Sequence, residues 1–373
     1  MKLSITKTEI SKALARVQGI AEKRNSMPIL ANVFLEATRD GQGGTLRASA
    51  TDLEVGLVGS HAAMVDKPGS VTVAARRLFE VVRELPDETV VLETTPNSYL
   101  ELHCLRSRFV LAGTSGEEYP PLPSVVPERT VRLQAAVLSH MIDRTMYAAS
   151  TDETRYNLNG VYLEVLETEQ RLRMVATDGH RLAYTDRSIG AEISNVASGV
   201  IIPRKGMGEL KRLVDEQDAD EIELGFSGNS VVAATPAVKL VMRLIEGEFP
   251  NYRQVLPKSS KHRVIVDSAT LEHVLRRVQI VTDGGRGIHL QITPGKLSIS
   301  AKNPDVGEAY EEIDLDYAGE AVSIGFNPRY LLDCLGVFRS KEVEIGLIDD
   351  LSPVQIRPTD DLDALAVVMP MRL

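Results

Sequence analysis

The sequence predicts an α+β protein made of three copies of one unit, and three observations support this fold class. The chain has 373 residues, which is enough for two or three domains. A buried run that breaks into a polar turn occurs three times, beginning at Ala50, Ala176 and Ala301, about 125 residues apart. Each third also contains two segments in which a strand pattern leads into a helix pattern. Self-similarity at a fixed period predicts repeated architecture.

The first of these segments is a short strand followed by an amphipathic helix. Ile5 lies in the strand, and apolar residues follow five and nine positions later in the helix, beginning with Ile10. The same offsets recur after Leu133 and Val266 in the other two thirds. Thr8 is expected to cap the first helix, because a threonine hydroxyl can accept from the first backbone amides.

The second segment is again a strand that runs into a helix, at residues 70–85, 199–214 and 321–336. Alternating apolar and polar residues between and after the helices predict further strands. Each third is therefore expected to consist of two helices packed on a mainly antiparallel sheet.

Two proline-rich stretches, residues 118–123 and 248–252, separate the thirds. A residue that precedes proline avoids the helical conformation, so both stretches predict short extended linkers. We therefore expect three domains, at residues 1–125, 126–254 and 255–373.

The composition excludes several kinds of site. The two cysteines, Cys104 and Cys334, lie far apart, which excludes a disulfide framework and a cysteine-based metal motif. The N-terminal residues lack the apolar core of a signal peptide, and no apolar run is long enough to span a membrane. We therefore expect a soluble, cytoplasmic protein that has no membrane segment and needs no metal ion or other cofactor.

The distribution of charge matters more than its total. The net charge of −10 argues against binding to nucleic acid, because an acidic surface repels phosphate. The six predicted helical segments are nevertheless basic or neutral, so the acidic residues are concentrated in strands and loops. If the helices share one surface, that surface attracts phosphate. The alternative is that the basic residues simply cover solvated helix faces.

Only the middle copy of the repeated turn continues into Gly179, His180, Arg181 and Leu182. One interpretation is a hydrolase or a metal-dependent enzyme, in which Asp178 and His180 act as general base and orienting group or as metal ligands. The pattern is weak support, because residues i and i+2 share a face of any strand. No nucleophile motif, phosphate loop or metal-binding helix motif accompanies it. We therefore expect no catalytic residue.

Seven motifs in chain order resemble those of the bacterial DNA polymerase III β subunits, the sliding clamps. They are PIL from Pro28, ATDLE from Ala50, RYNLNG from Arg155, ATDGHRL from Ala176, IPRKG from Ile202, FPNYRQVLP from Phe249 and VVMPMRL from Val367. The resemblance extends over the whole chain. It implies a non-catalytic processivity factor in DNA replication, a head-to-tail homodimer whose six domains form a pseudo-sixfold ring around duplex DNA without sequence preference. It also implies that a clamp loader opens the ring.

The resemblance further implies a hydrophobic groove that binds short Gln-Leu-x-Leu-Phe-type peptides of the replicative polymerase, other polymerases and repair proteins. The groove residues that it implies are Arg155, Leu158, Thr177, Gly179, His180, Arg181, Leu182, Pro250, Val255, Tyr330, Val367, Met369, Pro370 and Met371. Gln254 and Pro353 depart from the family pattern, which leaves the detailed peptide preference open.

Two further sets of residues follow from the same resemblance. The implied DNA-binding residues are Arg24, Arg76, Arg77, Tyr156, Arg204 and Lys205. A family aromatic next to Tyr156 is Asn157 here, so the resemblance implies one stacking contact fewer. The implied dimer interface consists of Arg106, Arg108, Phe109 and Leu111 in the first domain and Ile280, Val281, Glu308 and Glu311 in the third.

Overall fold

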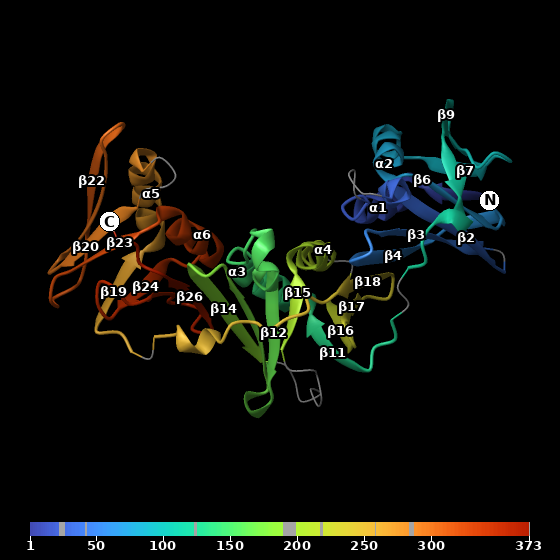
Figure 1. Ribbon diagram of the computed structural model, residues 1–373. Helices are drawn as coiled ribbons and strands as arrows, with labels where there is room; N and C mark the ends of the chain where they lie inside the picture. Colours follow the sequence, from blue (N-terminus) through green and yellow to red (C-terminus); the bar gives the residue numbers. More distant parts are fainter. Residues whose placement is uncertain are drawn as a thin grey trace. The chain divides into compact units, whose positions relative to one another are not determined.

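Figure 1 shows the fold in a computed structural model. The structure describes residues 1–21, 27–41, 43–122, 125–188, 199–216, 219–257, 259–282 and 287–372. In this part of the chain the α-helices are α1 (Lys7–Val17), α2 (Ala75–Glu84), α3 (Ala135–Met146), α4 (Arg204–Asp215), α5 (Ser268–Val278) and α6 (Pro328–Phe338). Among the described residues, no helix is long and apolar enough to cross a membrane.

Contacts within the chain divide it into two compact units. The first unit combines Met1–Ala136 with Lys205–Leu244, and the second combines Val137–Arg204 with Ile245–Leu373. The middle third of the sequence is thus shared between the two units.

The first unit contains two antiparallel sheets. One has nine strands in the order β10 (Gly113–Ser115), β6 (Gly69–Ala74), β2 (Asn32–Asp40), β3 (Gly43–Thr51), β4 (Val55–Ala62), β18 (Val238–Arg243), β17 (Ser230–Ala234), β16 (Glu221–Ser227) and β11 (Arg129–Gln134). The other has the order β5 (Met64–Lys67), β1 (Lys2–Thr6), β7 (Thr89–Thr94), β8 (Leu100–Cys104) and β9 (Ser107–Leu111). Leu57 pairs with Leu240, so β4 and β18 join strands that are far apart in sequence.

The second unit also contains two antiparallel sheets. The larger has the order β15 (Val200–Pro203), β12 (Gly160–Leu166), β13 (Arg171–Thr177), β14 (Arg181–Ser188), β26 (Ala364–Val368), β25 (Val354–Pro358), β24 (Glu342–Leu347) and β19 (His262–Asp267). The smaller has the order β22 (Gly307–Asp314), β21 (Lys296–Asn303), β20 (Ile288–Thr293) and β23 (Val322–Phe326). The pairing of β14 with β26 brings the middle third against the C-terminal third.

The helix ends follow ordinary capping chemistry. Thr6 caps α1 by accepting from the backbone amide of Glu9 at 3.3 Å. The expectation for Thr8 was therefore wrong, because its hydroxyl donates to Asp87 instead. Asp267 caps α5 in the same way by accepting from the amide of Thr270 at 2.8 Å. Each helix buries one apolar face, which matches the helical spacing in the sequence.

Candidate functional site

The turn between β13 and β14 is held by its own polar side chains. The Thr177 hydroxyl donates to the carbonyl of Arg181 at 2.6 Å, and the Asp178 carboxylate accepts from the amide of His180 at 2.9 Å. Gly179 has a φ of +87°, a conformation that suits glycine. Asp178 also accepts from the Arg181 side chain at 3.0 Å. The carboxylate that an enzyme would use as a base is therefore occupied in shaping the turn.

A cavity of about 140 Å³ lies beside this turn, within the second unit. The residues that line it are Leu158, Thr177, Gly179, Arg181, Leu182, Pro250, Asn251, Tyr252, Val255, Val367 and Met369. Nine of these eleven were predicted to form the peptide-binding groove. Asn251 and Tyr252 were not, although they lie in the motif that begins at Phe249.

The apolar floor of the cavity comes from strand pairing. Leu182 on β14 is the register partner of Val367 on β26, and both side chains are buried. Leu158 enters from the short helix η3 (Glu153–Leu158) and is also buried. Val255 remains 39% exposed and Met369 is half-buried. An apolar floor with accessible apolar residues suits the binding of an apolar side chain, and a methionine can adapt to its shape.

Arg181 fixes one wall of the cavity through contacts with three elements. Its guanidinium donates to Asp333 on α6 at 2.5 Å and to the carbonyl of Tyr147 at 2.8 Å. It also lies over the rings of Tyr147 and Tyr330. Burial lowers the pKa of Arg181, but the hydrogen bond to Asp333 and the nearby carboxylates raise that pKa overall. The side chain is therefore a fixed cation beside the turn.

The other five predicted groove residues lie outside the cavity lining but are linked to it. The Arg155 guanidinium donates to the carbonyl of Asp178 at 3.4 Å. The His180 ring stacks on Tyr330, with 6.3 Å between ring centroids, and burial raises the pKa of Tyr330. The backbone amide of Met369 donates to the carbonyl of His180 at 2.9 Å.

The C-terminal tail continues past the cavity. Pro370 follows Met369, and the backbone amide of Met371 donates to the carbonyl of Gly325 on β23 at 2.8 Å. Met371 lines a second cavity, on the smaller sheet.

A buried polar network lies under the segment that forms the opposite wall. Tyr252, in the short helix η5 (Tyr252–Gln254), donates its hydroxyl to the buried carboxylate of Glu164. Arg253 donates to Glu164 at 2.9 Å, and Arg173 donates to the Tyr252 hydroxyl at 3.2 Å. Arg173 also makes a bidentate pair with the buried Asp186, at 2.6 Å for both bonds.

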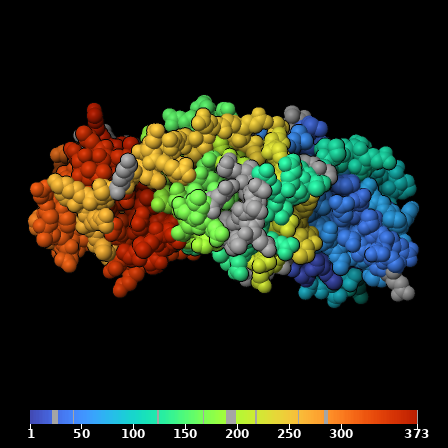
Figure 2. Space-filling model, turned by 90° about the horizontal axis from the view of Figure 1, so that it is seen from below, coloured from blue at the N-terminus to red at the C-terminus, as the bar shows by residue number. Residues whose placement is uncertain are grey.

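This network anchors the segment that carries Pro250 and Val255. Burial, partly opposed by Arg173, raises the pKa of Tyr252, so its hydroxyl stays protonated and can donate. Phe249 stacks on Tyr162, with 4.8 Å between ring centroids. Figure 2 shows gold residues from near position 255 at the surface, next to green residues of the same unit.

The residues predicted to bind DNA differ in how accessible they are. Arg24 lies outside the described residues. Arg76 and Arg77 on α2 are 58% and 77% exposed, and both form ion pairs with Glu80. Tyr156 is 58% exposed. Arg76 and Arg77 can therefore turn to a phosphate group at little cost, because exposed ion pairs contribute little to stability.

Two of the predicted DNA-binding residues make contacts within the protein. Arg204 donates to the carbonyl of Ala149 at 3.2 Å. Lys205 forms an ion pair with the buried carboxylate of Asp52. Lys205 therefore has a structural contact that would compete with phosphate.

The predicted dimer residues of the first domain lie on or beside β9, one of the two edge strands of the five-stranded sheet. Phe109 is 38% exposed and Leu111 is partly exposed. Arg106 is exposed, and Arg108 donates to Glu101 at 2.5 Å. The edge therefore presents unpaired backbone, apolar side chains and cations together.

The predicted dimer residues of the third domain lie on and near β22, which is an edge strand of the smaller sheet. Ile280 is 72% exposed, whereas Val281 packs partly on the core of its own unit. Glu308 pairs with Lys302 at 2.6 Å, and Glu311 accepts from Arg277 at 2.6 Å. This edge is acidic where the β9 edge is basic.

Comparison with known proteins identifies the family. Residues 1–123, 132–251 and 253–372 match the N-terminal, central and C-terminal domains of the DNA polymerase III beta subunit. The sequence is 34% identical over 378 residues to the beta sliding clamp of Caulobacter vibrioides, and 37% identical over 377 residues to that of Pseudomonas aeruginosa. Both comparisons cover 100% of each chain.

Solved structures agree with this assignment over their full length. The crystal structure of the DNA polymerase III subunit beta from Pseudomonas aeruginosa has a TM-score of 0.92 at 37% identity. The crystal structure of a sliding clamp from Bartonella birtlesii bound to griselimycin has a TM-score of 0.94 at 34% identity. Both comparisons cover 100% of each chain. The chain therefore belongs to the DNA polymerase III beta subunit family, the sliding clamps.

Proposed function

We propose that this chain is a DNA sliding clamp, a ring-shaped homodimer that encircles duplex DNA and tethers the replicative polymerase through a peptide-binding groove. The tethering role is supported by one observation, the apolar cavity beside the Thr177–Arg181 turn. Leu182 and Val367 form the floor of this cavity. Membership of the family makes the chain a non-catalytic subunit that confers processivity.

The DNA contacts are proposed to be sequence-independent. Arg76, Arg77, Arg204 and Tyr156 would face phosphate groups rather than base edges, and phosphate contacts carry no sequence information. Enclosure of the duplex makes a tight site unnecessary, and a tight site would oppose sliding. We propose three clamp domains, at residues 1–125, 126–254 and 255–373. We also propose that the protein is cytoplasmic and that a clamp loader opens the ring.

The groove is proposed to bind a partner peptide in one orientation. The apolar cavity between Leu182, Val255 and Val367 would take the Leu and Phe end of a Gln-Leu-x-Leu-Phe segment. Arg155, His180 and the backbone of Met371 would hold the glutamine end. This orientation follows the family pattern. Within the chain, the hydrogen bond from the amide of Met369 to the carbonyl of His180 holds the tail beside the turn.

The test is fluorescence anisotropy with a labelled Gln-Leu-x-Leu-Phe peptide. Val255→Glu places a charge at the exposed part of the cavity lining, and deletion of the chain from Met369 onward removes the tail wall. Loss of a buried anchor costs about 2 kcal/mol or more, so both variants should weaken binding at least ~30-fold. Leu362→Glu is the matched control, because Leu362 is an exposed apolar residue of the same unit outside the cavity.

Each variant must still sediment as a dimer for its affinity to be compared. Equal affinity in wild type, Val255→Glu and the deletion would place the peptide site elsewhere and contradict the proposed groove.

A further inference from the structure

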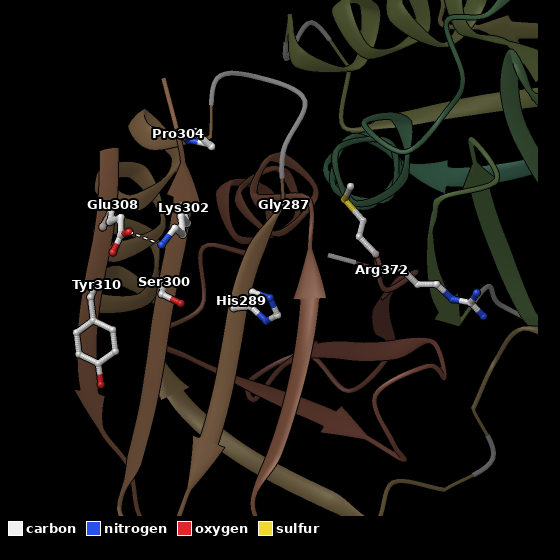
Figure 3. Close-up of a pocket in the computed structure, with 11 residues that line it drawn as sticks. Gly287, His289, Ser300, Lys302, Pro304, Glu308, Tyr310 and Arg372 are labelled. Atoms are coloured by element: carbon white, nitrogen blue, oxygen red, sulfur yellow. Dashed lines mark ion pairs between the residues drawn. The ribbon is translucent and has the colours of Figure 1, made fainter. Parts of the chain in front are cut away.

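The smaller sheet of the second unit carries a second cavity, of about 810 Å³, on its exposed face (Figure 3). Its floor crosses the strands in register: His289 on β20 pairs with Ser300 on β21, which pairs with Tyr310 on β22. Figure 3 shows these three side chains on the front of the sheet, whereas the side chain of Arg372 points away from them. The floor therefore offers two aromatic rings and a hydroxyl group to a ligand.

The equivalent face of the sheet is covered in the first third and in the middle third of the chain. Phe34 on β2 stacks on Tyr119, with 5.5 Å between ring centroids. Tyr162 on β12 stacks on Phe249, with 4.8 Å between ring centroids. Tyr119 and Phe249 are both buried, and each is followed by a proline. The covering segments that carry these aromatic–proline pairs are residues 114–120 and 245–250.

Strand register places His289 at the position that Phe34 and Tyr162 occupy in the other two thirds. Each of these three residues pairs with one residue of a neighbouring strand, and that residue also pairs with the segment after β9, β18 or β26. The neighbouring residues are Thr72, Ile201 and Gly325. The paired positions in the following segments are Thr114, Ile245 and Met371. The C-terminal tail therefore begins along the same path as the two covering segments.

The described part of the tail does not supply a covering aromatic. In the other two thirds, the stacking aromatic lies five residues after Thr114 and four residues after Ile245. The described tail reaches Arg372, which is one residue after Met371. His289 is exposed, and no aromatic ring among the described residues stacks on it. The cavity thus lies where an aromatic–proline pair packs in the other two thirds.

We propose that this face binds an extended segment of a partner protein in which an aromatic residue precedes a proline. The aromatic ring would stack on His289, as Phe249 stacks on Tyr162. The proline would keep the segment extended, because the residue before a proline avoids the helical conformation. The cavity shares no lining residue with the candidate groove, so this site goes beyond the proposed function.

A second copy of the chain is the other candidate for this face, because the cavity reaches β22, the strand of the proposed dimer contact. In that dimer, β9 of one copy pairs with β22 of the other, edge to edge. Pairing of this kind continues a sheet and leaves its faces uncovered. The cavity therefore borders the dimer contact and stays open to a partner protein.

The test is fluorescence anisotropy on the dimeric protein with a labelled peptide that has the sequence of residues 245–251, Ile-Glu-Gly-Glu-Phe-Pro-Asn. Replacing the phenylalanine of the peptide by alanine should weaken binding at least about tenfold, because the stacked ring is lost. His289→Ala removes the ring on the protein and Ser300→Trp fills the floor, so each should weaken binding to a similar extent. Gln291→Ala is the matched control, because Gln291 is exposed on the same face of the same strand but outside the cavity lining.

A second variant tests the path of the tail. Glu-Phe-Pro-Asn added after Leu373 places the phenylalanine four residues after Met371. The added segment should occupy the cavity and prevent the free peptide from binding, because a tethered ligand has a high effective concentration. Glu-Ala-Pro-Asn added at the same place should leave the free peptide bound.

Four results would overturn the inference. The first is no binding of the peptide to wild type at about 1 mM protein. The second is binding that survives both His289→Ala and Ser300→Trp. The third is displacement by the Gln-Leu-x-Leu-Phe peptide, which would place the segment in the groove. The fourth is binding to Ile280→Glu monomers but not to the dimer, which would assign the face to the second copy.

The same variants separate this site from the proposed groove. His289→Ala and Ser300→Trp should leave the affinity for the Gln-Leu-x-Leu-Phe peptide unchanged, and Val255→Glu should leave the affinity for the aromatic–proline peptide unchanged. Failure of one peptide to bind therefore counts against one site and not against the other.

Discussion

Tyr252 lines the candidate groove and also closes the polar network beneath it. Tyr252→Phe keeps the ring but removes the hydroxyl that donates to Glu164 and accepts from Arg173. A buried polar group that loses its partner costs about 1–3 kcal/mol, so the free energy of unfolding should fall by that amount. Affinity for the Gln-Leu-x-Leu-Phe peptide should fall as well, because the segment that contains Pro250 and Val255 loses an anchor. Denaturant unfolding and peptide anisotropy measure the two effects.

Tyr162→Phe is the control for this prediction. Tyr162 belongs to the same aromatic cluster, and its change leaves the hydrogen bonds of Glu164 in place. Tyr252→Phe could lose stability as expected and still bind the peptide with wild-type affinity. That result would show that the network supports the fold but not the groove.

At the residue scale, the resemblance to family motifs predicts most of the cavity lining. Nine of the predicted residues line one cavity, and most of them lie in three motifs, which begin at Arg155, Ala176 and Phe249. The network beneath could not be predicted, because Glu164 and Tyr252 are 88 positions apart and a lone glutamate in a strand has no sequence signal for burial. Tertiary pairing decides which polar residues of a strand become buried.

At the scale of elements, the helices follow closely from the apolar periodicity. The expected helix at residues 328–341 is α6 (Pro328–Phe338), and it ends where Arg339 adopts a left-handed conformation with a φ of 50°. Helix ends are harder to predict than helix interiors. The sequence predicts Thr8 as the cap of α1, whereas Thr6 caps this helix in the structure. Either hydroxyl could accept a bond from a first-turn amide, and in the structure Thr6 is the residue at the junction of β1 and α1.

The prediction about dimer assembly concerns two edge strands, β9 and β22. In the proposed dimer, β9 of one copy meets β22 of the other, so that cations meet carboxylates and these two edges are covered. Ile280→Glu and Phe109→Glu should each cost about 2 kcal/mol or more, a ~30-fold rise in the dimer dissociation constant. Ile280 is the better probe than Val281, which packs partly on its own core. Analytical ultracentrifugation over a concentration series measures the constant.

Leu351→Glu is the matched control for the dimer, because Leu351 is 60% exposed and lies on neither edge strand. A dimer dissociation constant that is unchanged in both edge variants would contradict this interface.

At the scale of the whole molecule, the threefold repeat could be predicted, but the way in which the sheets join the repeats could not. The pairing of β4 with β18 and of β14 with β26 places the middle third partly in each compact unit. Linker prolines mark where the sequence repeats, whereas the sheets are continued by strand pairing between residues far apart in the chain. Such pairing depends on edges that meet only in the folded protein.

The central claim is that the protein holds DNA by encircling it, and retention on circular DNA tests this most directly. The protein is loaded onto a nicked circular plasmid by a bacterial clamp loader with ATP and is then separated by gel filtration at moderate salt. We predict that it elutes with the circular DNA and is lost once a single-cutting restriction enzyme makes the DNA linear, because phosphate contacts alone are weak and salt-sensitive. Equal retention on circular and linear DNA would contradict topological linkage.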